Sequence, residues 1–117
     1  MKVAVIGSRD FPHREQVERW LNWHGPCRED TLISGGARGV DRWAEEWAEK
    51  VGVPTEVFPA DWEGLGRRAG FVRNAQVVDA ADRVVIFWDG MSPGSKSVIN
   101  HCHSMMKDYE VHFPHAT

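Results

Sequence analysis

The sequence predicts an α/β protein with a Rossmann-like three-layer sandwich and a mainly parallel five-stranded sheet. One observation is the regular alternation of short apolar segments, rich in β-branched residues, with amphipathic segments along all 117 residues. The other is that the segments between the expected strands are long enough for the helical crossovers that parallel strands need. Because no linker or repeat interrupts this pattern, we expect a single domain over residues 1–117.

The expected strands are short and mostly end where glycine or a polar loop follows. KVAVI ends at Gly7, TLIS ends at Gly35, and RVVIFW is the most apolar of the set. The five expected strands are residues 2–6, 31–34, 54–58, 83–88 and 109–113.

The expected helices carry apolar side chains at helical spacing with charged residues between them. The clearest is VDRWAEEWAEKV, which places Val40, Trp43 and Trp47 on one stripe and ends at Gly52. Trp20, Trp43 and Trp47 are expected in the core by the same spacing. The four expected helices are residues 14–24, 40–51, 66–81 and 95–107.

Composition limits the classes of function. Lys and Arg number 14 and Asp and Glu number 17, a net charge of −3, which disfavours a protein that mainly coats nucleic acid. Cys27 and Cys102 have no metal or redox spacing, so reduced thiols and a cytoplasmic location are expected. No apolar segment predicts a leader or a membrane partner. In HCH, adjacent helical residues point in different directions, so no metal site is expected there.

In a doubly wound sheet, ligands bind outside the carboxyl ends of the strands, near the switch in strand order. The loops at that edge read GSRD, SGGARG, PADW and DGMSPGS, and two of them lead directly into helix starts. Free amides and the helix dipole make a helix start a site for anions, and glycines allow a phosphate close approach. The alternative is that the glycines merely make tight turns. Two such loops with Arg9 nearby favour a phosphate- or nucleotide-type ligand.

Two familiar nucleotide motifs are missing from the sequence. The first turn reads GSRDF instead of G-x-G-x-x-G, and no G-x-x-x-x-G-K-[ST] occurs. Ordinary nicotinamide enzymes and P-loop NTPases are therefore disfavoured.

Four segments in order carry a resemblance to a known family: GSRDF, LISGGARGVDRWAEEWAEKVGVP, FPADWEGLGRRAGFVRN and ADRVVIFWDGMSPGS. Over about residues 3–112 the chain resembles the stand-alone SLOG-domain proteins related to YspA and YpsA. Their superfamily includes the DNA-processing protein A proteins and the Lonely guy phosphoribohydrolases. The resemblance implies a Rossmann-like fold that binds nucleotides or nucleotide-derived ligands, in some relatives as a sensor in bacterial and phage conflict systems.

The resemblance also supports particular residues. SGGARGVD is similar to the ligand loop of the DNA-processing branch, and GMSPGS is similar to the second phosphate loop of the phosphoribohydrolases. The candidate ligand- and phosphate-binding residues are Gly7, Ser8, Arg9, Ser34, Gly35, Gly36, Arg38, Gly39, Asp41, Arg73, Asn74, Gly90, Ser92, Gly94 and Ser95.

Several candidates keep an alternative. Trp62 would stack on a base or pack over its loop. Arg73 and Asn74 would clamp a base or ribose, or be a surface arginine and a helix-interior asparagine. Asp41 would orient Arg38, cap its helix or bind a ribose hydroxyl.

A cofactor is not expected to be required. Asp89 would hold Mg²⁺ together with a ligand phosphate, but one carboxylate is a weak metal signal.

The favoured function is a binding module or sensor for a nucleotide-derived ligand. The first alternative is an N-glycosidase acting on nucleoside monophosphates, but Val98 stands where the resembled enzymes place their catalytic glutamate. Asp41, Asp61 or Asp89 would then have to replace it. The second alternative is single-stranded nucleic-acid binding, which would weaken steeply with salt. Small sheets of this kind often pair, so a homodimer is a further expectation.

Overall fold

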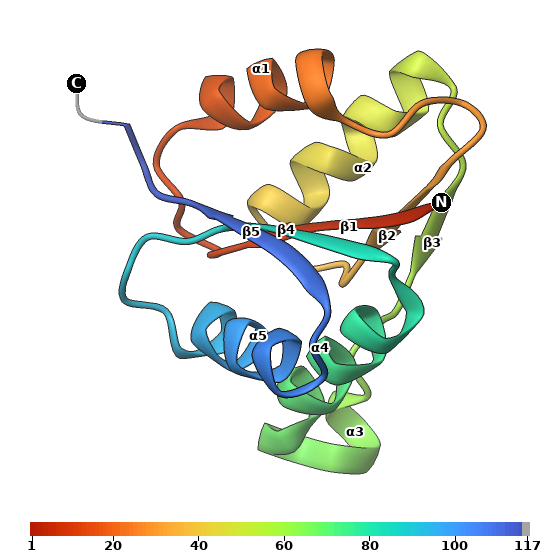
Figure 1. Cartoon of the computed structure of the whole chain (residues 1–117). Helices are drawn as coiled ribbons and strands as arrows, with labels where there is room; N and C mark the ends of the chain where they lie inside the picture. Colours follow the sequence, from red (N-terminus) through yellow and green to blue (C-terminus); the bar gives the residue numbers. More distant parts are fainter. Residues whose placement is uncertain (116–117) are drawn as a thin grey trace.

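The computed structural model describes residues 1–115, and in it five strands form one sheet in the order β3-β2-β1-β4-β5 (Figure 1). Every neighbouring pair of strands is parallel, which confirms the predicted fold class. The elements in chain order are β1 (Lys2–Gly7), α1 (Arg14–His24), β2 (Thr31–Ser34), α2 (Val40–Val51), β3 (Thr55–Val57), α3 (Trp62–Leu65), the 3₁₀ turn η1 (Gly66–Arg68), α4 (Ala69–Ala80), β4 (Arg83–Phe87), α5 (Pro93–Ser104) and β5 (Asp108–His112).

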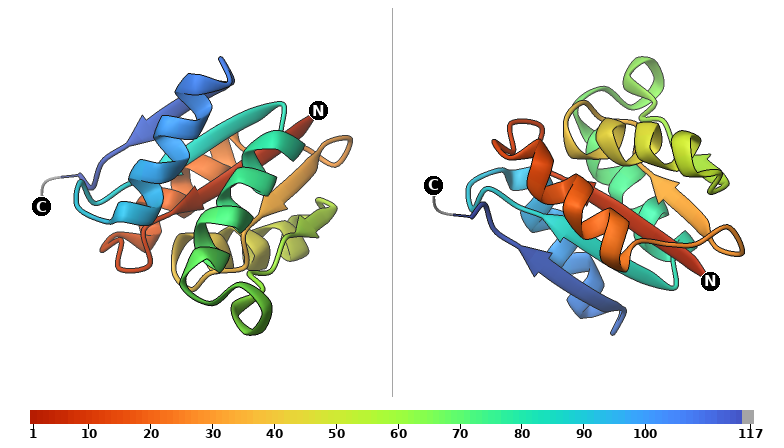
Figure 2. Two further views of the ribbon diagram at one scale, coloured as in Figure 1. Left: turned by 90° about the horizontal axis from the view of Figure 1, so that it is seen from below. Right: turned by 90° about the horizontal axis from the view of Figure 1, so that it is seen from above.

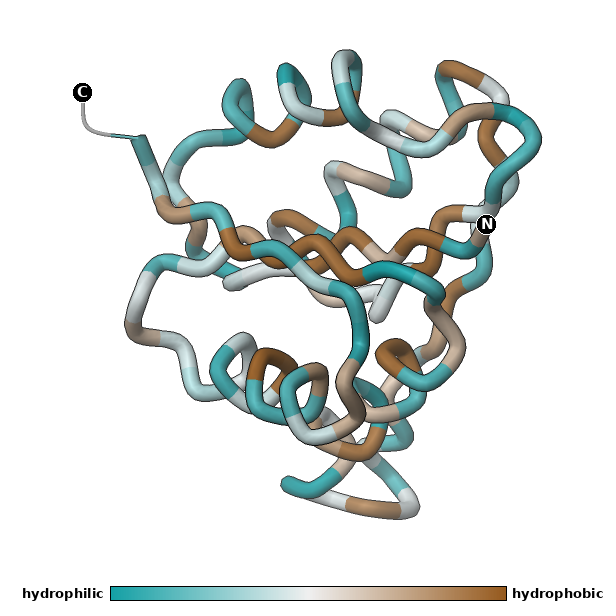
Figure 3. Tube along the Cα trace, viewed as in Figure 1, coloured by the Kyte–Doolittle hydropathy of each residue, from teal (hydrophilic) through white to brown (hydrophobic). Residues whose placement is uncertain are grey.

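Helices cover both faces of the sheet. In Figure 1, α1 and α2 lie above the strands, and α4 and α5 lie below them; the views from below and above in Figure 2 show the two pairs separately. Successive side chains of β1 point to opposite faces of the sheet and so contribute to two separate core clusters. Val3 and Val5 pack with α1 and α2, whereas Ala4 and Ile6 pack with α4 and α5. Figure 3 shows the apolar residues of the strands gathered in the middle layer, between the two layers of helices.

The strand order places a crevice between the loops that follow β1 and β4. The two strands pair from Val3 opposite Arg83 to Gly7 opposite Phe87, so they end at the same level. The chain then leaves β1 toward α1 on one face and leaves β4 toward α5 on the other. This is the switch point at which doubly wound folds bind ligands.

The structure corrects some predicted boundaries. The helix expected over 66–81 is divided into η1 and α4, and the short helix α3 was not predicted. Gly66 has φ +59°, a conformation that ends α3 and that side chains rarely adopt. Helix α5 begins at Pro93, two residues earlier than expected, because proline suits the first helical position. Among the described residues, no helix is long and apolar enough to cross a membrane.

Candidate functional site

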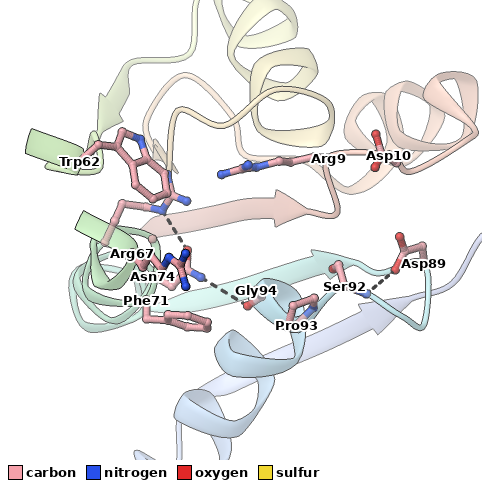
Figure 4. Close-up of a pocket in the computed structure, with 12 residues that line it drawn as sticks. Arg9, Asp10, Trp62, Arg67, Phe71, Asn74, Asp89, Ser92, Pro93 and Gly94 are labelled. Carbon is pink, nitrogen blue, oxygen red and sulfur yellow. Dashed lines mark hydrogen bonds between the residues drawn. The ribbon is translucent and has the colours of Figure 1, made fainter. Parts of the chain in front are cut away.

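A cavity of about 290 Å³ opens at the carboxyl edge of the sheet, beside the switch point (Figure 4). Its walls come from the loop after β1, from α3 and the segment through α4, and from the loop that begins α5. The lining residues are Arg9, Asp10, Trp62, Arg67, Gly70, Phe71, Arg73, Asn74, Asp89, Ser92, Pro93 and Gly94.

Two aromatic rings stand at this cavity. Trp62 is 52% exposed and Phe71 is 51% exposed, although both are large apolar side chains. The guanidinium carbon of Arg9 lies 5.9 Å from the centre of the Trp62 ring, within the range of a cation–π contact. In Figure 4, Trp62 and Arg9 lie on one side of the space, and Phe71 and Gly94 lie on the other. The arrangement offers flat apolar surface next to positive charge.

The start of α5 supplies hydrogen-bond donors to the same cavity. A helix leaves its first amides without partners inside the helix, and here Pro93 has no N–H, so Gly94 and Ser95 provide the donors. Within residues 1–115, no side chain caps this helix start. The hydroxyl of Ser92 lies instead 2.9 Å from the hydroxyl of Ser8. Because Gly94 lines the cavity, an anion there would meet free amides and the positive end of the helix dipole.

The loop before α5 is fixed by Asp89. Its carboxylate accepts hydrogen bonds from the amides of Met91 and Ser92, both at 2.8 Å, while its own amide donates to the Ser8 hydroxyl at 3.0 Å. Partial desolvation raises the pKa of Asp89, but these backbone bonds outweigh it, so the pKa lies below its usual value. Among the described residues, no group of three or more His, Cys, Asp or Glu side chains is arranged to hold a metal ion.

The glycine-rich loop after β2 surrounds a carboxylate of the protein itself. Asp41 is buried and accepts hydrogen bonds from the amides of Gly35 at 3.1 Å, Ala37 at 3.4 Å and Gly7 at 3.2 Å. Desolvation raises the pKa of Asp41 to about 6, against the lowering effect of Arg73 and of these amides. The loop therefore has the form of an anion cradle, and the side chain of Asp41 occupies it.

The close contacts of this loop also explain its glycines. A Cβ on Gly39 would lie 2.6 Å from the carbonyl oxygen of Arg9, and φ at Gly39 is +78°. A Cβ on Gly35 would lie 2.7 Å from a carboxylate oxygen of Asp41. The spacing of SGGARG is thus required by contacts within the chain.

Arg73 and Asn74 connect the two loops. Arg73 is 7% exposed, and its guanidinium donates to the carbonyl oxygen of Gly35 and, through Nε at 2.9 Å, to Asn74 Oδ1. Asn74 Nδ2 donates in turn to the carbonyl oxygen of Gly94 at 3.3 Å. Burial lowers the pKa of Arg73, and the nearby charge of Asp41 raises it in part.

The predicted site residues fall into two groups. Those that line the cavity are Arg9, Trp62, Arg73, Asn74, Ser92 and Gly94. Those that are not among its lining residues are Gly7, Ser8, Ser34, Gly35, Gly36, Arg38, Gly39, Asp41, Gly90 and Ser95.

Some of the second group have structural partners of their own. Ser34 donates to Glu45 at 2.6 Å. Arg38 is 71% exposed and pairs with Asp10 at 3.1 Å. Gly36 and Gly90 have positive φ in their turns.

Sequence reasoning missed several lining residues, chiefly Asp10, Arg67 and Phe71. Arg67 lies in η1 and Phe71 lies in α4, both within the span 66–81 that the sequence predicts as a single helix. The signal that could have found them is the dense run of arginine, glycine and aromatic residues in DWEGLGRRAGF.

The fold and the cavity define a Rossmann-like α/β protein with a ligand-type cavity at its switch point. The chain belongs to the YspA, cpYpsA-related SLOG family, whose profile matches residues 1–64. It is 40% identical over 109 residues to the Gene 61 protein of Mycobacterium phage D29, an alignment that covers 86% of this chain and 84% of that protein. No solved structure matches the chain.

Proposed function

We propose that the protein binds a nucleotide-derived ligand in the cavity at the switch point and acts as a binding module or sensor. The observation that carries this proposal is that one cavity joins two half-exposed aromatic rings to the uncapped start of α5. Membership of the SLOG family supports it, because that family points to nucleotide-related ligands.

In this proposal the phosphate lies at the start of α5. The amides of Gly94 and Ser95 and the hydroxyl of Ser92 donate to it, and Arg9 and Arg67 neutralise its charge. The loop after β2 is the weaker phosphate site, because its amides already bind Asp41. The cavity volume is near the lower end for ligand pockets, which favours a ligand with one nucleoside unit.

The base lies against Trp62 and Phe71 in this arrangement. Stacking on an aromatic side chain tolerates every base, so the rings give affinity with little discrimination between bases. No metal is needed, since Asp89 already holds two backbone amides. A titration repeated with EDTA and with Mg²⁺ tests that point, and equal affinities are expected.

Gly94→Ala is the sharpest test. A Cβ at this position would have no atom nearer than 3.9 Å, the nearest being Asn74 Nδ2, and Asn74 also lines the cavity. The variant should fold at least as well as the natural chain, because alanine favours a helix over glycine by about 1 kcal/mol. The added methyl should nevertheless block a phosphate at the helix start.

The measurement is isothermal titration with AMP, GMP, CMP, UMP and ADP-ribose, together with mass spectrometry of small molecules carried through purification. Asn100→Ala, an exposed change on the same helix, is the matched control. We expect Gly94→Ala alone to lose binding of the phosphorylated ligand. Undiminished binding by a folded Gly94→Ala protein would refute a phosphate site at α5, and failure of the natural chain to bind or carry any nucleotide would refute the proposed function.

A further inference from the structure

We propose that Arg73 and Asn74 are positioning residues, which form a brace from the loop after β2 to the start of α5 and fix the phosphate-binding amide of Ser95. This inference rests on the proposed function for its effect on ligand affinity. The brace itself can be tested without any ligand.

Both polar ends of the Asn74 side chain are already used by the protein. Its Oδ1 accepts from Arg73 Nε at 2.9 Å, and its Nδ2 donates to Gly94 O at 3.3 Å, the bond drawn as a dashed line to Gly94 in Figure 4. An asparagine held at both ends in this way is poorly placed to read a base or ribose. Its position on the cavity wall instead makes it a support for what lies beside it.

The bond to Gly94 O acts on the neighbouring amide. The carbonyl of Gly94 and the N–H of Ser95 belong to one planar peptide unit, so fixing the direction of the C=O also fixes the direction of the N–H. That N–H is one of the free donors at the start of α5. Asn74 therefore orients a donor that the proposed phosphate needs.

The other end of the brace is anchored in the interior. Arg73 donates to Gly35 O, and Gly35 N donates to the buried carboxylate of Asp41. The charge of Asp41 favours the charged guanidinium, which burial alone disfavours. Gly70, one turn before Asn74, leaves room for the Trp62 ring, which would lie 3.3 Å from a Cβ there. A continuous chain of hydrogen bonds through Arg73 and Asn74 therefore connects the start of α5 to the loop that follows β2.

Two variants of Asn74 separate the halves of the brace. Asn74→Ala removes both bonds. Asn74→Asp keeps an acceptor for Arg73 and replaces the donor to Gly94 O with a carboxylate oxygen, which cannot donate. Gln76→Ala, an exposed amide on the same helix, is the matched control.

In the ligand-free protein, the amide signals are followed by ¹H–¹⁵N NMR. Asn74→Ala should shift both Gly35 and Ser95, Asn74→Asp should shift Ser95 with little change at Gly35, and Gln76→Ala should shift neither. An unmoved Ser95 signal in both Asn74 variants would overturn the brace, whether or not a nucleotide binds.

Affinity for AMP and for adenosine gives the functional readout. In Asn74→Ala the Ser95 amide is no longer oriented, and loss of its one hydrogen bond to the phosphate is expected to weaken AMP binding about fivefold. Adenosine, which has no phosphate, should bind with unchanged affinity. An equal loss for both compounds would overturn the positioning role in favour of direct contact with the nucleoside. If the natural chain binds neither compound while the NMR shifts are as expected, the proposed function fails and the brace stands.

Discussion

Gly39 illustrates how a single residue can be fixed by the chain around it. Its φ is +78°, and the carbonyl oxygen of Arg9 lies 2.6 Å from the place that a Cβ would take, so alanine would meet both conformational strain and a backbone clash. We expect Gly39→Ala to lower the free energy of unfolding by about 3 kcal/mol. Gly52 has φ +81°, but a Cβ added there would have Arg28 Nε, at 3.5 Å, as its nearest neighbour. Gly52→Ala should therefore lower the free energy of unfolding by only about 1 kcal/mol. Urea unfolding of both variants measures the difference, and equal losses would show that the clash is relieved by movement.

Asp41 makes stability depend on pH. Its pKa is raised from 3.8 to about 6 by burial, so below pH 3.8 the group is protonated in both states and its contribution to stability is fully present. As the pH rises toward and through 6, the unfolded chain ionises first and that contribution is lost. A shift of this size corresponds to about 3 kcal/mol.

The comparison with Asp41→Asn isolates this effect, because the amide does not titrate. We expect the stability of the natural chain, relative to the variant, to fall as the pH rises from about 4 to about 7. Chemical denaturation at closely spaced pH values gives the curve. A relative stability that rises over this window would mean that the amides and Arg73 outweigh desolvation.

The helices and strands that the sequence predicts best are those with a clear pattern of apolar residues. The bounds predicted for 14–24, 31–34 and 40–51 are confirmed. The two helices repeat apolar residues at helical spacing, and the strand is a short apolar run that ends at a glycine pair. Helix α3 has four residues and none is buried, so it leaves no such pattern. The position of the cavity at the carboxyl edge of the sheet follows from the strand order alone. That Phe71 lines the cavity depends instead on how α4 packs against the sheet, which the sequence pattern does not reveal. The sequence pattern of the loop after β2 is the same for an internal and an external anion, so the role of Asp41 as its occupant was not foreseen.

Helix α3 presents Trp62 to the cavity, and its removal should separate binding from stability. We expect Trp62→Ala to weaken binding of AMP by about 1–3 kcal/mol, the range for loss of one stacked base. Because the side chain is half exposed, the free energy of unfolding should change little. Trp23→Ala on α1 is the control, since that ring is 79% exposed and lies outside the cavity lining. The affinities for AMP are measured by calorimetric titration. If Trp62→Ala and Trp23→Ala changed the affinity equally, Trp62 would not be a ligand-binding residue.

Across the whole molecule, the carboxylates are placed so that few can serve glycosidic cleavage. The position of the resembled catalytic glutamate is Val98, which is 2% exposed and packs in the core below the sheet. Asp41 is buried behind the loop after β2, and Asp61 caps α3 by accepting from Gly64 at 2.9 Å. Asp10 and Asp89 remain at the cavity, and Asp89 is held by two backbone amides.

This distribution predicts that the protein does not release bases from nucleoside monophosphates at an enzymatic rate. Cleavage passes through an oxocarbenium-like state that a positioned carboxylate must stabilise, and loss of one such charge costs about two to three powers of ten. Incubation with AMP, GMP, CMP and UMP, followed by chromatography of the free bases, should show turnover well below about one per second. Faster release would contradict the binding-module proposal. Its abolition in Asp10→Asn or Asp89→Asn would then identify the carboxylate responsible, because these are the two that reach the cavity.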